Sequence, residues 1–251
     1  MVEIIGCGEA FDSQLGNNSC LLFQNKRPFL LIDCGYQVPE RIWRTIRRYQ
    51  DLQGVYLTHT HADHAFGIAP LLVRFWEEKR QDPFLIMGPK GIQSYVRKLM
   101  NLAYPSALKR LEFQIEYVEL TSGDQWQWGN YRFQCARSKH SVLNLALRIW
   151  NSKGRSIGIS GDGQLTSETK KLFHDVDILF HEVYEQRDRI PNHCNLESII
   201  NYSRNAKIGR IVLNHLSRQE RSAIEKKLPN IAKRFQFTKW QIGVPGDQFS
   251  F

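Results

Sequence analysis

Short apolar runs dominate the first two thirds of the chain. Runs of about four to eight residues, bounded by glycine, asparagine or aspartate, are typical of β-strands. Such runs predict strands at Val2 to Ile5, Ser19 to Phe23, Phe29 to Ile32, Gly54 to Leu57, Phe84 to Met87, Phe113 to Leu120, Gln125 to Trp128, Tyr131 to Ala136, Val142 to Trp150, Ser156 to Ser160, Ile178 to Glu182 and Ile211 to Asn214.

Other segments repeat their apolar residues every three or four positions, which indicates amphipathic helices. In one of them, Ile42, Trp43 and Ile46 lie on one face, with arginines opposite. The order of strands and helices predicts an α/β (α+β) fold in which two sheets pack together with helices outside. The predicted helices are Val38 to Tyr49, Ala65 to Arg80, Gly88 through about Met100, Thr166 to Phe173, Asn195 to Arg204 and Arg218 to Ala232.

The composition is that of a soluble globular protein. A hydrophobic content of 42% and a charged content of 24% allow a large core. The pattern contains no linker or low-complexity run, so we expect residues 1–251 to form a single domain. The first residues lack the features of a signal peptide, and no apolar run approaches a membrane span. Five cysteines, an odd number in apolar runs, favour buried thiols in the cytoplasm over a disulfide framework.

The net charge of +9 leaves two interpretations open. A positive chain can attract an anionic partner such as a nucleic acid. The basic residues are scattered along the chain, however, and scattered charge is equally typical of a solvated surface.

The segment that follows the strand near residue 54 carries the densest group of candidate ligands. It reads His59-Thr-His61-Ala-Asp63-His64. Residues two apart on an extended chain point the same way, so His59 and His61 can face one point. Asp63 and His64 lie where a helix begins and can face a second point. Because imidazole and carboxylate groups bind zinc, manganese or iron, the segment predicts two ligands for each of two metals. The alternative, which this pattern disfavours, is four solvated residues with Asp63 as a helix cap.

Further polar residues follow other predicted strands. His140, Asp162 and His215 each stand just past an apolar run, where active-site groups gather in α/β folds. Each alone would more often be a capped turn or a structural histidine, but together they complete two coordination shells. Asp33 also ends a strand, where it either hydrogen-bonds the loops beside a site or caps its own turn.

In this order the motifs resemble the metallo-β-lactamase superfamily, over nearly the whole chain from Gly6 to His215. The resemblance implies the αββα sandwich, two mixed β-sheets packed face to face with helices outside. It also implies two divalent metal ions, zinc first and manganese or iron as alternatives. Carried over residue by residue, it assigns one metal to His59, His61 and His140, the other to Asp63, His64 and His215, and a bridging position to Asp162.

Within the superfamily the chain is most similar to ribonuclease Z and its phosphodiesterase relatives. Residues 31–35, Leu-Ile-Asp-Cys-Gly, resemble that family's Asp-Cys-Gly turn. Residues 180–184, Phe-His-Glu-Val-Tyr, resemble its His-Glu-Ala-Thr segment, and Asn-His-Cys-Asn at 192–195 stands where it has a His-Ser-Thr turn. Residues 213–218, Leu-Asn-His-Leu-Ser-Arg, resemble its Leu-Thr-His-Phe-Ser segment with a nearby arginine.

This resemblance implies a dinuclear phosphodiesterase or endoribonuclease-like hydrolase. Two metals can hold a bridging hydroxide and neutralise charge on a phosphoryl group, and Asp63 could aim that hydroxide. The resemblance assigns protonation of the leaving alkoxide to His193, oriented by Glu182, because a histidine suits a general acid at pH 7. The structural alternatives are a surface turn for His193 and a strand-end cap for Glu182.

The chain departs from ribonuclease Z between His140 and Asp162. That family usually carries a long arm for transfer RNA there, whereas this chain has room for one strand pair around Trp150 to Arg155. The departure favours a compact phosphodiesterase that acts on smaller or differently presented substrates. RNA remains a candidate substrate. We expect no membrane partner. The resemblance also implies a homodimer.

Two other functions compete with phosphodiester cleavage. A lactone, ester or thioester hydrolase would use the same dinuclear site to polarise a carbonyl group. A binding module would keep the fold without metals. The His-Glu segment and the basic charge favour the phosphodiesterase, and the filled ligand positions disfavour the binding module.

Overall fold

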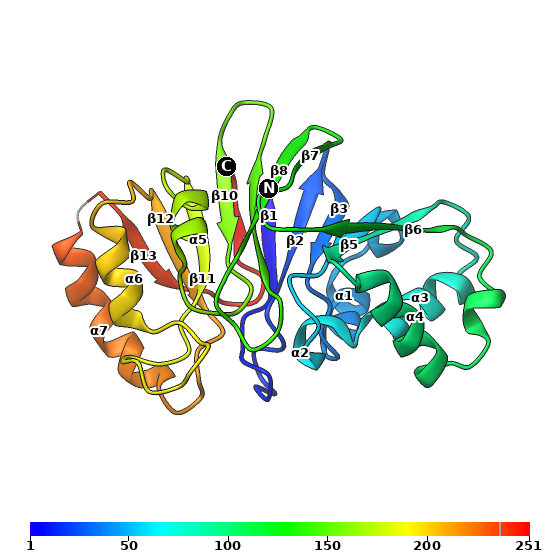
Figure 1. Cartoon of the computed structure of the whole chain (residues 1–251), viewed down its shortest axis with the longest axis horizontal. Helices are drawn as coiled ribbons and strands as arrows, with labels where there is room; N and C mark the ends of the chain where they lie inside the picture. The colour runs from blue at the N-terminus through cyan, green and yellow to red at the C-terminus, as the bar shows by residue number, and fades with distance from the viewer. Residues whose placement is uncertain (236) are drawn as a thin grey trace.

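Two mixed β-sheets face each other in the centre of the molecule, with helices on either side (Figure 1). The computed structural model describes residues 1–235 and 237–251. Each sheet has seven strands in this part of the chain. In both sheets, three antiparallel pairings at one end are followed by three parallel pairings at the other. The predicted αββα sandwich is confirmed, and the two halves share one layout.

The first sheet is built from the N-terminal half of the chain and closed by the last strand. Its helices are α1 (Val38–Thr45), α2 (Ala62–Ala65), α3 (Ile68–Glu77) and α4 (Ile92–Ala103), with 3₁₀ turns η1 (Tyr49–Asp51) and η2 (Ala107–Lys109). Across the sheet its strands are β14 (Gln248–Phe249), β1 (Val2–Gly6), β2 (Ser19–Gln24), β3 (Arg27–Ile32), β4 (Gly54–Tyr56), β5 (Phe84–Pro89) and β6 (Ile115–Leu120).

The second sheet is built from the C-terminal half. Its helices are α5 (Ser167–Leu172), α6 (Leu196–Ser203) and α7 (Arg221–Arg234), which lie together at one end of the molecule (Figure 1). Across the sheet its strands are β13 (Lys239–Ile242), β12 (Arg210–Asn214), β11 (Ile178–Glu182), β10 (Ser156–Ile159), β9 (Leu145–Trp150), β8 (Tyr131–Arg137) and β7 (Gln125–Trp128).

The two-residue period of the strands divides their apolar side chains between the two faces of each sheet. In β3, Leu30 and Ile32 pack between the sheets, whereas Leu31 packs under the helices. Aromatic rings help to fill the central layer: Trp126 stacks on Phe133 with their centroids 5.1 Å apart. This layer joins the two sheets and holds their strand ends in a common position.

One predicted helix is wrong, because the structure has two separate helices in its place. The pattern predicts a helix from Ala65 to Arg80, but α2 ends at Ala65 and α3 begins at Ile68. The N–H of Gly67 donates to the carbonyl of Cys34 over 2.8 Å, which turns the chain away. Pro70 then fits the first turn of the new helix, because its missing N–H has no partner there. Asp63 and His64 therefore lie inside α2.

Other differences concern element ends. The helix predicted through Tyr49 ends at Thr45, because Ile46 has extended dihedrals of −102° and 101°. The helix predicted from Gly88 begins only at Ile92, since β5 continues through Pro89 beside β6. The apolar pattern predicts no strand after Ala232, whereas the structure has β13, which is half polar, and β14, which has two residues.

The cysteines behave as the sequence predicts. All five are buried and free. Burial raises the pKa of the Cys7 thiol to about 11, which leaves it un-ionised at neutral pH. Within residues 1–235 and 237–251, no helix is both long and apolar enough to cross a membrane.

The hydrogen bond between the sheets generates a prediction. The buried Tyr56 hydroxyl donates to the carbonyl of Leu145 across the central layer, over 3.0 Å. We expect Tyr56→Phe to lower the free energy of unfolding by about 1 kcal/mol, because a buried carbonyl loses this donor. Urea denaturation measures the change. Tyr104→Phe, at an exposed phenol, is the control and should change nothing; equal effects would contradict the prediction.

Candidate metal centre

The predicted ligands gather at one edge of the sandwich, where strands of both sheets end. β4 leads into His59, β10 into Asp162 and β12 into His215. These three strands take part in parallel pairings, and the carboxyl ends of parallel strands are where α/β folds place their sites. His140, which follows β8, completes the group.

Four side chains, here called the first cluster, form one possible coordination shell. His140 Nε2 lies 3.2 Å from His61 Nδ1. His140 Nε2 and His59 Nε2 each lie 3.9 Å from Asp162 Oδ2. One ligand atom from each member falls within 4.8 Å of the others, and the members are His59, His61, His140 and Asp162.

A second cluster lies beside the first. His64 Nε2 is 3.4 Å from Asp63 Oδ2 and 3.3 Å from Asp162 Oδ1. His215 Nε2 is 3.3 Å from Asp63 Oδ2 and 3.5 Å from Asp162 Oδ2. The members are Asp63, His64, Asp162 and His215.

Asp162 belongs to both clusters. Its Oδ2 faces His59 and His140, and its Oδ1 faces His64. The geometry thus groups all seven predicted ligands as the resemblance does. Which residue binds which ion stays a prediction.

Several atoms at the centre are buried without a hydrogen-bond partner. Among the described residues, these include Nε2 of His59, Nε2 of His64 and Oδ1 of Asp162. Leaving such an atom unpaired costs about 1–3 kcal/mol each. A divalent cation is a partner that nitrogen lone pairs and carboxylate oxygens can share. The residues therefore fit a divalent metal ion.

Burial and neighbouring charges place two ligands in the form that a metal binds. Burial lowers the pKa of His59 well below its usual value, so its imidazole is neutral. For Asp162, burial acts against ionisation, but the charges of His215 and His64 outweigh it and hold the pKa well below its usual range. Neutral imidazole and ionised carboxylate are the ligand forms that metals need.

Asp33 orients one histidine of each cluster. His64 Nδ1 donates to Asp33 Oδ2 over 2.7 Å, which leaves Nε2 for the second cluster. The Thr58 hydroxyl donates to Asp33 and lies 3.0 Å from His59 Nδ1, whose proton it can accept. Of the two roles that the sequence leaves open for Asp33, the structure therefore favours bonding beside a site. Such partners determine which ring nitrogen faces the metal.

The backbone at this edge is unusually constrained. Asp33, Asn192 and His215 have φ values of 61°, 65° and 53°, which non-glycine residues rarely adopt. A Cβ at Gly35 would lie 1.9 Å from the carbonyl oxygen of Asp63, so only glycine lets the two segments approach this closely. Among the described residues, Asp33, Asn192 and His215 are three of nine non-glycine positions with a positive φ.

His193 and Glu182 lie against both clusters. His193 Nδ1 donates to Glu182 Oε2 over 2.9 Å, and Glu182 is fully buried. The His193 ring lies 5.1 Å from that of His140 and 5.8 Å from that of His215, centroid to centroid. Burial works against protonation of His193, but the hydrogen bond and charge of Glu182 outweigh it and raise the pKa above its usual value.

Other residues at the centre escape the sequence analysis. Tyr184 stacks on the His193 ring, with centroids 4.7 Å apart. Asn144 accepts the Asp162 N–H, and Ser138 donates to the Asp162 carbonyl. Tyr184 is the last residue of the segment at 180–184 that resembles the family's His-Glu-Ala-Thr segment, but the resemblance gives it no role. Nothing in the apolar pattern distinguishes Asn144 and Ser138 from ordinary loop residues.

The contact of Asp33 with His64 generates a prediction about metal affinity. We expect Asp33→Asn to weaken metal binding about 10- to 100-fold, because His64 and His59 lose the group that orients them. Titration with a zinc-buffered indicator measures the affinity. Asp124→Asn, which alters a turn cap at Thr121, is the control. Unchanged affinity in Asp33→Asn would show that Asp33 only caps its turn.

The charge on His215 generates a second prediction. Burial disfavours its charged form, but Asp162 and the hydrogen bond with Asp63 outweigh this and raise the pKa to about 9. The metal-free ring is therefore protonated at pH 7 and must lose its proton to bind an ion. We expect metal affinity to rise with pH up to about 9. Calorimetry at pH 7 in buffers of different ionisation enthalpy should show proton release; a heat that is the same in all buffers would contradict this.

Comparisons with known proteins agree with this geometry. The ribonuclease Z of Limosilactobacillus fermentum is 22% identical in an alignment 274 positions long, which covers 86% of this chain and 87% of that protein. The metallo-β-lactamase fold protein YhfI from Bacillus subtilis superposes with a TM-score of 0.81 at 20% identity, covering 98% of this chain and 96% of that one. The short form of human tRNase Z superposes with a TM-score of 0.78 at 20% identity, and the superposition covers 99% of this chain and 98% of that one.

A family model is more specific than these pairwise similarities. The family described as "Anti-Pycsar protein Apyc1" matches residues 1–237. The two His/Asp clusters fit a divalent metal ion. The chain therefore belongs to the Anti-Pycsar protein Apyc1 family, has the metallo-β-lactamase fold and is a ribonuclease Z-like, metal-dependent hydrolase.

Proposed function

We propose that this protein hydrolyses phosphodiesters at a two-metal centre, with His193 as the general acid. The observation that carries the proposal is the pair of clusters sharing Asp162, with the Glu182–His193 pair beside both. This arrangement supplies ligands for two ions and a separate proton donor. Glu182 raises the pKa of His193 above its usual value, which supports His193 as a proton donor.

The first and second clusters would hold the two ions, zinc first and manganese or iron as alternatives. When bound, such ions activate water as a nucleophile and neutralise the charge that builds on a phosphoryl group. Asp63 is partly accessible, with 10% of its side chain exposed, and can accept a hydrogen bond from the attacking water and orient it.

Glu182 holds His193 in one orientation. It accepts from His193 Nδ1 and also from the N–H groups of Gly163 and Cys194. Because Nδ1 is occupied, Nε2 is the nitrogen left to protonate a leaving alkoxide. The His193 side chain is 20% exposed, so a substrate can reach it. Tyr184 covers one face of the ring and limits its rotation.

The names of the similar proteins support RNA as a candidate substrate. One is called a ribonuclease Z and another a tRNase Z. β9 and β10 form a direct antiparallel pair between His140 and Asp162, so the structure has no arm at this point in the described residues. We therefore propose a small or single-stranded phosphodiester substrate. The comparisons do not favour the lactone, ester or thioester alternative.

Three further expectations belong to this proposal. The ligands span residues 59 to 215 and the layer between the sheets draws on residues from Val2 to Phe249, which supports residues 1–251 as one hydrolase domain. Five free thiols support a reducing compartment such as the cytoplasm. The homodimer implied by the resemblance stays a prediction.

Replacing the proposed general acid tests the mechanism. We expect His193→Ala to keep its bound metal but to hydrolyse a dinucleotide about 10²- to 10⁴-fold more slowly, because the alkoxide leaves unprotonated. Metal analysis and initial rates measure the two effects. With bis(p-nitrophenyl) phosphate, whose leaving group needs little protonation, the loss should be much smaller.

The matched control is His174→Ala, at an exposed histidine outside both clusters. It should leave both rates unchanged. An equal loss on both substrates in His193→Ala would indicate a positioning role instead, and no loss on either would end the general-acid assignment.

The substrate class has its own test. We expect the metal-loaded protein to hydrolyse a chromogenic phosphodiester with zinc or manganese, because two cations can neutralise the charge that builds on a phosphoryl group, and to be inactive on a lactone. Side-by-side assays should include a precursor transfer RNA. Turnover of the lactone alone would overturn the phosphodiesterase proposal.

A further inference from the structure

The loop that carries His193 also contacts a predicted metal ligand. This loop leaves β11 after Glu182 and enters α6 at Leu196. Within it, the carbonyl of Asn192 accepts a hydrogen bond from Nδ1 of His140 over 2.7 Å. The next residue, His193, donates from its own Nδ1 to Glu182. Two neighbouring residues of one loop therefore hold a candidate ligand and the proposed general acid.

The bond to Asn192 decides which ring nitrogen of His140 can bind a metal. A carbonyl oxygen can only accept, so Nδ1 of His140 carries the hydrogen and Nε2 keeps its lone pair. That Nε2 lies 3.2 Å from His61 Nδ1 and 3.9 Å from Asp162 Oδ2, inside the first cluster. The Asn192 carbonyl therefore acts on His140 as the outer hydrogen-bond partner that metal-binding histidines usually have.

The backbone of Asn192 has a conformation that few residue types adopt. Its φ of 65° lies in the left-handed region. Glycine adopts this region freely and asparagine does so more readily than most residues, whereas a β-branched residue is a genuine outlier there. Because this dihedral sets the direction of the peptide between residues 192 and 193, the residue type at position 192 controls where that carbonyl and the following imidazole lie.

Hydrogen bonds within the loop hold Asn192 in place. At the base of the loop, the N–H of Leu196 donates to the carbonyl of Glu185 over 2.9 Å. In its interior, the buried carboxylate of Glu185 accepts the N–H groups of Arg189 and Ile190, both over 2.6 Å. A loop bonded to itself in this way resists rotation of the peptide that faces His140.

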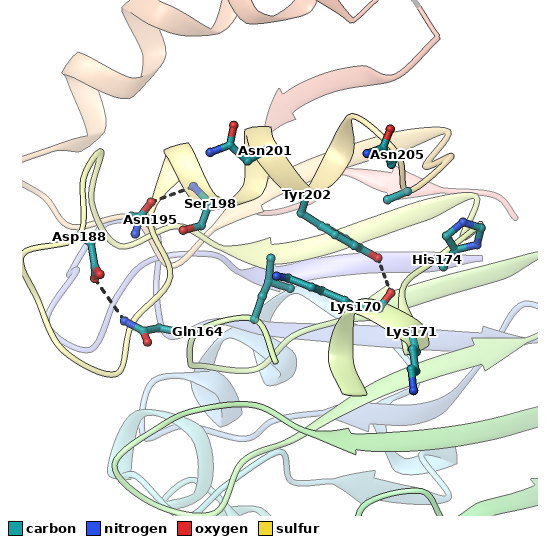
Figure 2. A pocket seen from close by; sticks show the side chains of 12 residues that line it. Gln164, Lys170, Lys171, His174, Asp188, Asn195, Ser198, Asn201, Tyr202 and Asn205 are labelled. Carbon is teal, nitrogen blue, oxygen red and sulfur yellow. Dashed lines mark hydrogen bonds between the residues drawn. The ribbon is translucent and has the colours of Figure 1, made fainter. Parts of the chain in front are cut away.

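Two further contacts join the loop to the rest of the molecule. Gln164, which follows Asp162 by two positions, donates to Asp188 over 3.2 Å (Figure 2). Both residues line the groove between α5 and α6. Glu220, the N-cap of α7, accepts from the Arg189 guanidinium over 2.5 Å. The loop is thus fastened both to the segment of Asp162 and to α7.

We propose that Asn192 is a positioning residue, whose left-handed backbone holds the carbonyl that orients His140 and places His193 beside the first cluster. The part that concerns His193 rests on the proposed phosphodiesterase function. The rings of His140 and His193 lie 5.1 Å apart, centroid to centroid, and a turn of the peptide between residues 192 and 193 would move both contacts. The loop therefore couples metal affinity to the placement of the proton donor.

Variants at position 192 test the backbone conformation alone. Asn192→Gly accepts the left-handed region, Asn192→Ala disfavours it, and Asn192→Val disfavours it most. The control is Asn25→Val, which imposes the same strain at a φ of 51° in an exposed turn between β2 and β3, outside both clusters. A zinc-buffered indicator measures affinity, and urea denaturation checks that each variant is folded.

We expect Asn192→Val to weaken zinc binding about 10- to 100-fold, because His140 loses the partner that orients it. Asn192→Ala should lose less affinity, and it decides the test if the valine variant does not fold. Asn192→Gly and Asn25→Val should bind zinc as the parent does, although Asn25→Val is less stable. In ¹⁵N-edited NMR spectra of the zinc-loaded protein, the Nδ1 hydrogen of His140 should exchange with water faster in Asn192→Ala. At saturating zinc, Asn192→Val should lose more activity on a dinucleotide than on bis(p-nitrophenyl) phosphate.

Three outcomes would overturn the proposal. These are parent-like zinc affinity in the folded alanine and valine variants, an equal loss of affinity in Asn25→Val, and an equal loss in Asn192→Gly. Equal losses on the two diesters would overturn the part that concerns His193. Weaker zinc binding by Asn192→Val, in a protein that hydrolyses no diester, would overturn the proposed function but support the positioning of His140. Diester hydrolysis with unchanged zinc affinity in that variant would do the reverse.

Discussion

The carboxylate of Asp162 is the point on which the structure of the metal centre depends. It is buried, and its two oxygens face histidines of both clusters. Holding such groups together without a cation is unfavourable, because unpartnered polar atoms lose their hydration. The close-packed layer between the two sheets compensates for that cost and prevents the ligands from moving apart. Metal binding would remove the cost of the unpartnered polar atoms, so we expect metal affinity and fold stability to be coupled.

Two further buried carboxylates extend this organisation outward. Asp33 contacts His64 directly and reaches His59 through Thr58, so one side chain orients a ligand in each cluster. Glu182 holds His193 and accepts two backbone N–H groups. Each carboxylate lies at the end of a strand in a different sheet. The centre is therefore arranged in layers, in which the sheets position the carboxylates and the carboxylates position the histidines.

The distribution of charge changes the meaning of the net charge of +9. Several basic residues are already paired on the surface, as Arg44 is with Glu40 and Arg189 with Glu220. Such exposed pairs contribute little to stability and do not mark a nucleic-acid footprint. Lys170 and Lys171 line a groove between α5 and α6, whose lining also includes the acidic Asp188. Net charge alone therefore does not identify a partner.

The order of strands and helices predicts two packed sheets, and the motifs, with the family they resemble, predict the αββα sandwich and the seven candidate ligands. Strand periodicity is local, and a ligand motif of this density after a buried strand has few other uses. The separation of α2 from α3 and the contacts of Asp33 with both clusters appear only in the folded chain. These features depend on contacts between distant residues, such as the Gly67 N–H with the Cys34 carbonyl. A local pattern carries no record of such contacts, because they form only when the two sheets pack together.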